Sequence, residues 1–143
     1  IDDIYVSSDD DEILSISKDY GAKPLKRALS ISDDNTPKIV VIRSVLKQKK
    51  LLKDGKPEVV VIPQANSPEI TTKNIDDGLN LMKQYYLWEV MSANTNGVQN
   101  AALRIVRANQ INNKFLSAHC GFITFDCLDV HTFEDIKKLE NKI

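Results

Sequence analysis

The chain has 143 residues, of which 42% are hydrophobic and 27% charged, and its formal net charge is −1. This is the length and composition of one globular domain, which excludes a fully disordered chain and a collagen-like repeat. The longest apolar runs, 39–42 and 59–62, are too short to cross a bilayer, and the small net charge provides no global attraction to nucleic acid or membrane. Two cysteines form no disulfide framework, which suits a reducing compartment and hence an intracellular protein. We expect the chain to be a piece of a larger protein, with the nucleus favoured over the cytoplasm.

Residues 1–36 are predicted to form an acidic, largely extended arm. They carry nine acidic residues against four basic ones, with acidic runs at 9–12 and 33–34. The short apolar patch Ile13-Leu14-Ser15-Ile16 has the spacing of an extended strand rather than of a helix. Such a segment has too little apolar area to fold alone, so we expect it to order only against the domain or a partner.

Residues 37–143 are predicted to form a single α+β domain that begins with a β-hairpin over about 38–62. The β-branched run 38–47 predicts the first strand, and 58–62 predicts the second. Asp54-Gly55 between them is a dipeptide typical of a tight hairpin turn.

Helical spacing of apolar residues predicts a buried central helix over about 75–92, with Asn74 as its N-cap. Gly97 is suited to end that helix, and a second helix is expected over 98–108. A further strand is predicted around 120–125, and Thr132 is expected to cap a last helix. The predicted fold is thus a small mixed sheet, containing the hairpin, packed by the central helix and two further helices.

The residues that most resemble an enzyme or metal site are His119, Cys120, Cys127 and His131. Successive strand residues point to opposite faces, so the side chains of His119 and Cys120 diverge and a zinc site is not expected. All five glycines are isolated, which leaves no phosphate-binding loop. We therefore expect no catalytic residue, no metal and no cofactor.

Residues 118–125 resemble the third-strand signature of RNA-recognition motifs. Gly121, Phe122, Ile123 and Phe125 match that signature, whereas Ala118, His119 and Cys120 depart from it. The resemblance implies a strand that presents aromatic side chains for stacking on bases.

The predicted hairpin carries a basic face. Residues 37–57 hold seven basic residues against Asp54 alone, and alternation along the strand places four of them on one side: Arg43, Lys47, Lys49 and Lys53. This face could receive an acidic peptide, including the chain's own arm, or the phosphates of a nucleic acid. Lysines on an edge strand also serve simply to discourage aggregation.

The arm carries a second candidate partner-binding segment. Ile13, Leu14 and Ile16, preceded by the acids of 9–12, resemble a motif that binds the small ubiquitin-like modifier. The resemblance implies addition of a short strand to the modifier's sheet, with the flanking acids against a basic rim. Ser7, Ser8 and Ser30 have the flanking charges of kinase sites, and phosphates there would deepen the negative charge.

Together these patterns predict a non-enzymatic protein–protein interaction or scaffolding domain of a regulatory protein. It would dock by strand addition and acidic–basic contacts onto another protein or an acidic peptide, and homo-oligomers fit this mechanism. The alternative is a nucleic-acid-binding domain that uses the basic hairpin Arg43–Lys53. No membrane partner is expected.

Overall fold

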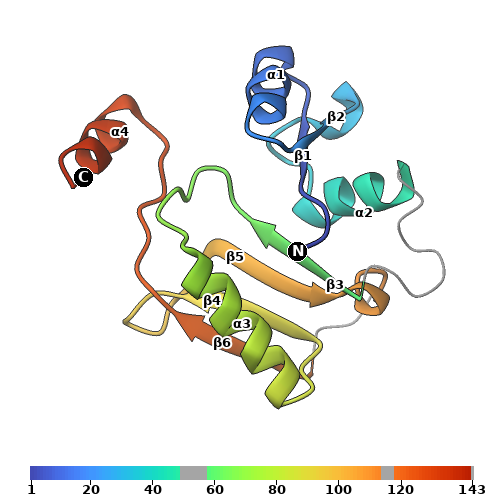
Figure 1. Ribbon diagram of the computed structural model, residues 1–143, viewed down its shortest axis with the longest axis vertical. Helices are drawn as coiled ribbons and strands as arrows, with labels where there is room; N and C mark the ends of the chain where they lie inside the picture. The colour runs from blue at the N-terminus through green and yellow to red at the C-terminus, as the bar shows by residue number, and fades with distance from the viewer. Residues whose placement is uncertain (49–57, 114–117, 143) are drawn as a thin grey trace. The chain divides into compact units, whose positions relative to one another are not determined.

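The computed structural model describes residues 1–48, 58–113 and 118–142 (Figure 1). The chain divides into two compact units, Ile1–Lys56 and Pro57–Ile143. The described residues form four α-helices, a two-stranded sheet and a four-stranded sheet, which confirms the predicted α+β class. The boundary expected at residue 36 lies inside the first unit.

The first unit contains a β–α–β segment where an extended arm was predicted. Strands β1 (Tyr5–Ser8) and β2 (Lys23–Lys26) pair in parallel, and helix α1 (Asp11–Asp19) connects them. A 3₁₀ turn, η1 (Leu29–Ile31), and helix α2 (Lys38–Gln48) follow. The prediction of a largely extended arm is therefore wrong.

Helix α1 forms because its ends are well capped. The Asp10 carboxylate accepts hydrogen bonds from the amides of Glu12 (2.8 Å) and Ile13 (3.0 Å), which satisfies two amides that the helix leaves unpaired. Acidic residues fill the first turn and Lys18 the last, as the helix dipole favours. These end effects outweigh the β-branched side chains on which the strand prediction relied.

Helix α2 occupies the residues predicted to form the first hairpin strand, so that prediction is also wrong. Pro37 precedes the helix, and its carbonyl accepts a hydrogen bond from the Val40 amide at 2.8 Å. Proline suits a helix start because its φ is already helical and it has no amide to leave unpaired. Each Val or Ile costs a helix no more than about 0.7 kcal/mol, an amount that tertiary context readily offsets. The predicted Asp54-Gly55 turn lies outside the described residues.

The second unit is built on a four-stranded sheet in the order β3-β5-β4-β6. Its strands are β3 (Val59–Pro63), β4 (Glu89–Ala93), β5 (Gln99–Arg107) and β6 (Cys120–Thr124). Strand β5 pairs antiparallel with both β3 and β4, whereas β6 pairs parallel with β4. Helix α3 (Thr72–Gln84) packs on one face of the sheet (Figure 1). The core between them consists of Met82, Leu87, Val90, Leu103 and Ile105.

The predicted central helix is shorter than expected and gives way to a strand. It ends at Gln84, and residues 89–92 belong to β4. Tyr86 adopts φ 55°, and the Leu87 amide donates to the Met82 carbonyl at 3.0 Å, which is the Schellman arrangement of a helix end. At the start, Thr71 and not Asn74 is the N-cap, and Asn74 completes a capping box with it.

The helix predicted over 98–108 is strand β5. Gly97, expected as a helix cap, has φ 81° and lies in the turn between β4 and β5, where its amide donates to Asn94 at 2.9 Å. The predictions at 58–62 and around 120–125 are confirmed as β3 and β6. The last helix is also confirmed as α4 (Phe133–Glu140), capped by Thr132.

Candidate partner-binding surfaces

The residues of the predicted basic face do not share a hairpin strand. Arg43 and Lys47 lie on helix α2, four residues apart and therefore on one side of it. Lys49 and Lys53 lie outside the described residues. The basic edge strand that was expected to receive a partner is therefore not formed by residues 38–48.

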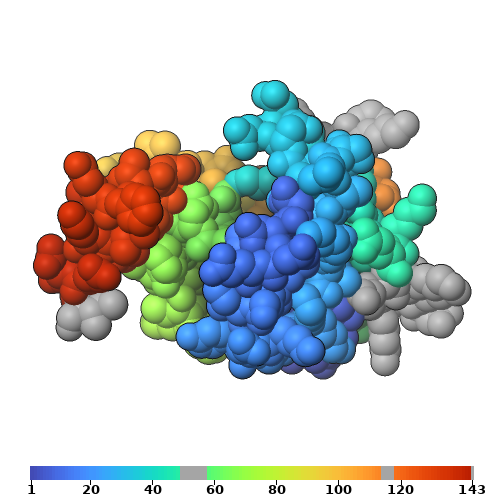
Figure 2. Space-filling view, turned by 90° about the horizontal axis from the view of Figure 1, so that it is seen from above, coloured from blue at the N-terminus to red at the C-terminus, as the bar shows by residue number. Residues whose placement is uncertain are grey.

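The arm residues Ile13, Leu14 and Ile16 lie on helix α1, not on a strand. Ile13 and Ile16 are each 50% exposed, while Leu14 is partly buried. Ile13, Ile16 and Tyr20, the residue that ends α1, recur at helical spacing and are exposed. Figure 2 shows atoms of α1, in blue, at the surface of the face in view. A helical segment offers no strand to another sheet, so strand addition through these residues is not supported.

Several acids of residues 1–36 pair with bases of the same segment. The ion pairs are Asp3–Lys23, Asp9–Arg27 at 3.0 Å and Asp11–Lys26 at 2.5 Å. Arg27 holds the pKa of Asp9 below its ordinary value, and Lys23 does the same to the pKa of Asp3. Part of the acidic charge that was expected to attract a basic partner is therefore already neutralised within the segment.

The three candidate phosphorylation sites differ in access. Ser8 is buried, and its Oγ accepts a hydrogen bond from the Asp10 amide at 3.1 Å. Ser7 is partly buried, and Ser30 is exposed in η1. Of the three, Ser30 is the only one that is exposed.

Strand β3 lies at an edge of the sheet but lacks the charged residues that edge strands normally carry. No strand among the described residues pairs with β3 opposite β5. Its sequence, Val59-Val60-Val61-Ile62-Pro63, holds no charge, and its four aliphatic residues are all partly buried. Continuous aliphatic runs of this kind are typical of internal strands, whereas edge strands normally carry lysines, bulges or inward charges that block further pairing.

Backbone alternation shows which groups the free edge presents. The Glu58 carbonyl accepts from the Ala108 amide at 3.0 Å, and the Gln64 amide donates to the Ala102 carbonyl at 2.8 Å. Even-numbered residues of β3 therefore direct their backbone groups toward β5, and Val59 and Val61 direct theirs outward. Pro63 follows at the end of the edge and has no amide to donate.

Strand β6, at the other edge, has the pattern of a strand that is buried on one side. Its residues alternate between exposed and partly buried, with Phe122 49% exposed and Ile123 packed on the core. Phe125, just beyond β6, also packs on the core. Of the aromatic side chains that suggested an RNA-recognition strand, Phe122 is thus the one open to stacking.

Within the described ranges, no group of three or more His, Cys, Asp or Glu residues could hold a metal ion. Cys120 is exposed, and burial raises the pKa of the partly buried Cys127 thiol. No helix in the described part of the chain is long and apolar enough to span a membrane. Comparison of the chain with protein-family models and with curated proteins found no match.

Proposed function

We propose that this chain is a protein–protein interaction domain that docks by strand addition at the free edge of β3. The observation that carries the proposal is an uncharged aliphatic strand at the edge of the sheet, with the backbone groups of Val59 and Val61 directed outward. An added strand would satisfy those groups and cover side chains on both faces of the sheet. This mechanism keeps the strand addition expected from the sequence but moves it from the arm to β3.

The partner that this edge fits best is a second copy of the chain. In an antiparallel pairing about a two-fold axis, Val59 lies opposite Val61 of the second copy, and each exchanges both backbone hydrogen bonds with the other. Pro63 then lies beyond this pairing, so its missing amide costs nothing. Val60 lies on the axis, opposite Val60 of the second copy, where side chains approach most closely.

Charge placed at Val60 tests this arrangement. Val60→Lys puts like charges directly opposite each other and should weaken self-association about tenfold or more, measured by sedimentation velocity over a range of protein concentrations. Val60→Glu, studied by itself, should weaken self-association by a similar factor. An equimolar mixture of the two variants should restore the dimer, because Lys then faces Glu.

Phe122→Lys is the matched control, since it adds the same charge on the same face of the sheet but on the opposite edge strand. It should leave self-association unchanged. A wild-type chain that stays monomeric at high concentration, or a Phe122→Lys variant that dissociates as much as Val60→Lys, would refute the proposal.

A further inference from the structure

One end of the second unit gathers four exposed aromatic rings that the proposed docking edge does not use. Tyr85 and Tyr86 directly follow helix α3, Trp88 directly precedes strand β4, and His119 directly precedes strand β6. We call them the aromatic cluster. Tyr85 is 55% exposed, Tyr86 77% and Trp88 37%.

The cluster is held together by the ends of three adjacent strands. The Trp88 amide donates to the His119 carbonyl at 2.9 Å, and the centroids of the two rings lie 6.0 Å apart. The Arg107 amide, at the end of β5, donates to the Trp88 carbonyl at 2.9 Å. These hydrogen bonds tie Trp88, in the short connection between α3 and β4, to His119 just before β6 and to the end of β5.

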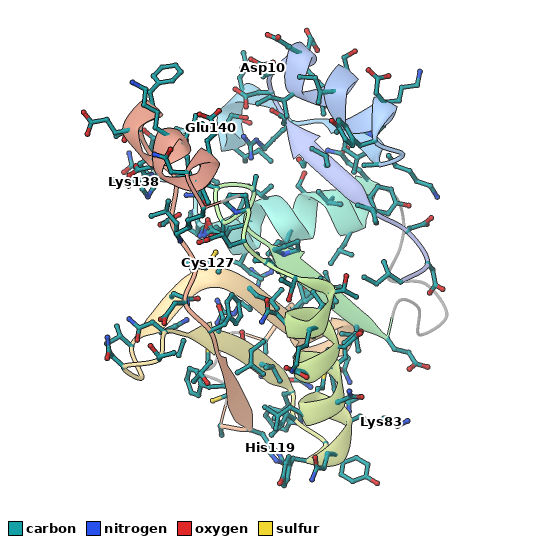
Figure 3. All side chains as sticks on the ribbon, turned by 60° about the vertical axis from the view of Figure 1, so that its left-hand side comes forward. Asp10, Lys83, His119, Cys127, Lys138 and Glu140 are labelled. Carbon is teal, nitrogen blue, oxygen red and sulfur yellow. The ribbon has the colours of Figure 1, made fainter. Side chains whose placement is uncertain are left out.

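Two cations border the cluster. Arg107 donates a hydrogen bond from its Nε to the Leu87 carbonyl at 2.9 Å, which holds the guanidinium next to residues 85–88. Lys83 lies in the last turn of α3, and Figure 3 shows it at the same end of the unit as His119. Neither Lys83 nor Arg107 has a carboxylate oxygen within 4.0 Å among the residues that the structure describes.

The backbone at Tyr86 is a second, independent observation. Its φ of 55° lies in the left-handed region, where the end of a helix normally has glycine. The bulky side chain at this position is mostly exposed, so packing does not compensate for the strain. Strain of this kind concentrates at functional sites, and here it turns an aromatic ring outward beside Tyr85.

We propose that the aromatic cluster binds single-stranded nucleic acid. Exposed rings give bases a surface to stack on without regard to sequence. Lys83 and Arg107, which form no ion pair with a described residue, suit the phosphates between those bases. This site shares no residue with the basic hairpin Arg43–Lys53, which the sequence suggested as a nucleic-acid-binding surface. It is also independent of strand addition at β3, because none of its residues belongs to that edge.

Trp88 makes the proposal directly measurable, since it is the only tryptophan of the chain. Stacking of a base on the cluster should quench Trp88 fluorescence when the full chain is titrated with oligothymidylate of about ten nucleotides, a length within the usual range of such sites. Two phosphate contacts predict about a sevenfold loss of affinity between about 50 and about 200 mM salt.

Two pairs of variants separate the roles of rings and charge. Tyr86→Gly relieves the strained backbone and removes one ring, so affinity should fall about fivefold or more while the fold is retained. Tyr20→Ala, which removes an even more exposed tyrosine from the first unit, should change nothing. Lys83→Gln should reduce the salt effect to about 2.6-fold, whereas Lys73→Gln, at the opposite end of α3, should leave it intact.

Three results would overturn the proposal. They are no quenching of Trp88 fluorescence, quenching that does not depend on salt, and an equal loss of affinity in Tyr86→Gly and Tyr20→Ala. Quenching by polyproline but not by the oligonucleotide would overturn it as well, because it would identify a proline-rich peptide as the ligand. The V60K variant should still be quenched, so failure of this proposal and failure of strand addition can be told apart.

Discussion

Replacing Tyr86 by glycine should make the second unit more stable, which is unusual for removal of a large side chain. The left-handed conformation costs a residue other than glycine about 1–2 kcal/mol. Glycine would lose about 0.5–1 kcal/mol of this gain through its greater freedom in the unfolded chain. Because the Tyr86 side chain is mostly exposed, little packing is lost. The expected net gain in the free energy of unfolding is about 0.75 kcal/mol, the middle of a range from about 0 to about 1.5 kcal/mol.

Urea denaturation followed by the emission of Trp88 measures this gain, and thermal unfolding should show a Tm higher by about 3–6 °C. Tyr86→Ala is the first control, because alanine keeps the backbone penalty and should give no gain. Tyr85→Gly is the second, since Tyr85 has φ −107° and glycine there should only destabilise. If Tyr86→Gly proves no more stable than Tyr86→Ala, the strain assigned to Tyr86 is incorrect.

Two further predictions concern polar groups that support the second unit. The buried Ser92 Oγ accepts from the Leu103 amide at 2.9 Å, so Ser92→Ala should cost about 1–3 kcal/mol of unfolding free energy, measured by urea denaturation. The pKa of Asp135 is lowered by Lys138 and by its capping hydrogen bonds, so its stabilising effect is present above the ordinary carboxyl pKa of about 3.9 and is lost as the pH falls. Asp135→Asn should therefore flatten the loss of stability as the pH falls below about 5, relative to the wild-type chain. An unchanged pH profile in Asp135→Asn would contradict this role of Asp135.

Local signals in the sequence predicted the parts of the fold that local interactions decide. Thr132 caps α4 as expected, and Gly97 has the positive φ expected of it. The uncharged run 59–62 forms a strand because its β-branched residues pair with β5. Each of these outcomes depends on residues near in sequence or on one strong propensity.

The errors arose where tertiary context overrides propensity. The β-branched run of α2 suggested a strand, but Pro37 starts a helix there. Residues 98–108 have an apolar spacing compatible with a helix. Residues 99–107 nevertheless form β5, an internal strand that pairs with β3 on one side and β4 on the other. Partners that are distant in sequence decide such segments, and the sequence alone does not show them.

The candidate surfaces were missed for a related reason. The sequence shows that residues 59–62 are apolar, but only the strand order places them at an edge. The signal for the aromatic cluster was present in Tyr85, Tyr86 and Trp88, which lie within the range 75–92 that was predicted to form a buried central helix. Ending the helix at Gln84 turns these side chains toward the surface.

Amide hydrogen exchange along β3 tests strand addition most directly, because neighbouring residues serve as their own control. The Val61 amide points to the free edge, whereas the Val60 and Ile62 amides point toward β5. Strand addition by a second copy predicts that protection of the Val61 amide rises with protein concentration while protection at Val60 and Ile62 stays constant. Rapid exchange at Val61 at every concentration would contradict it.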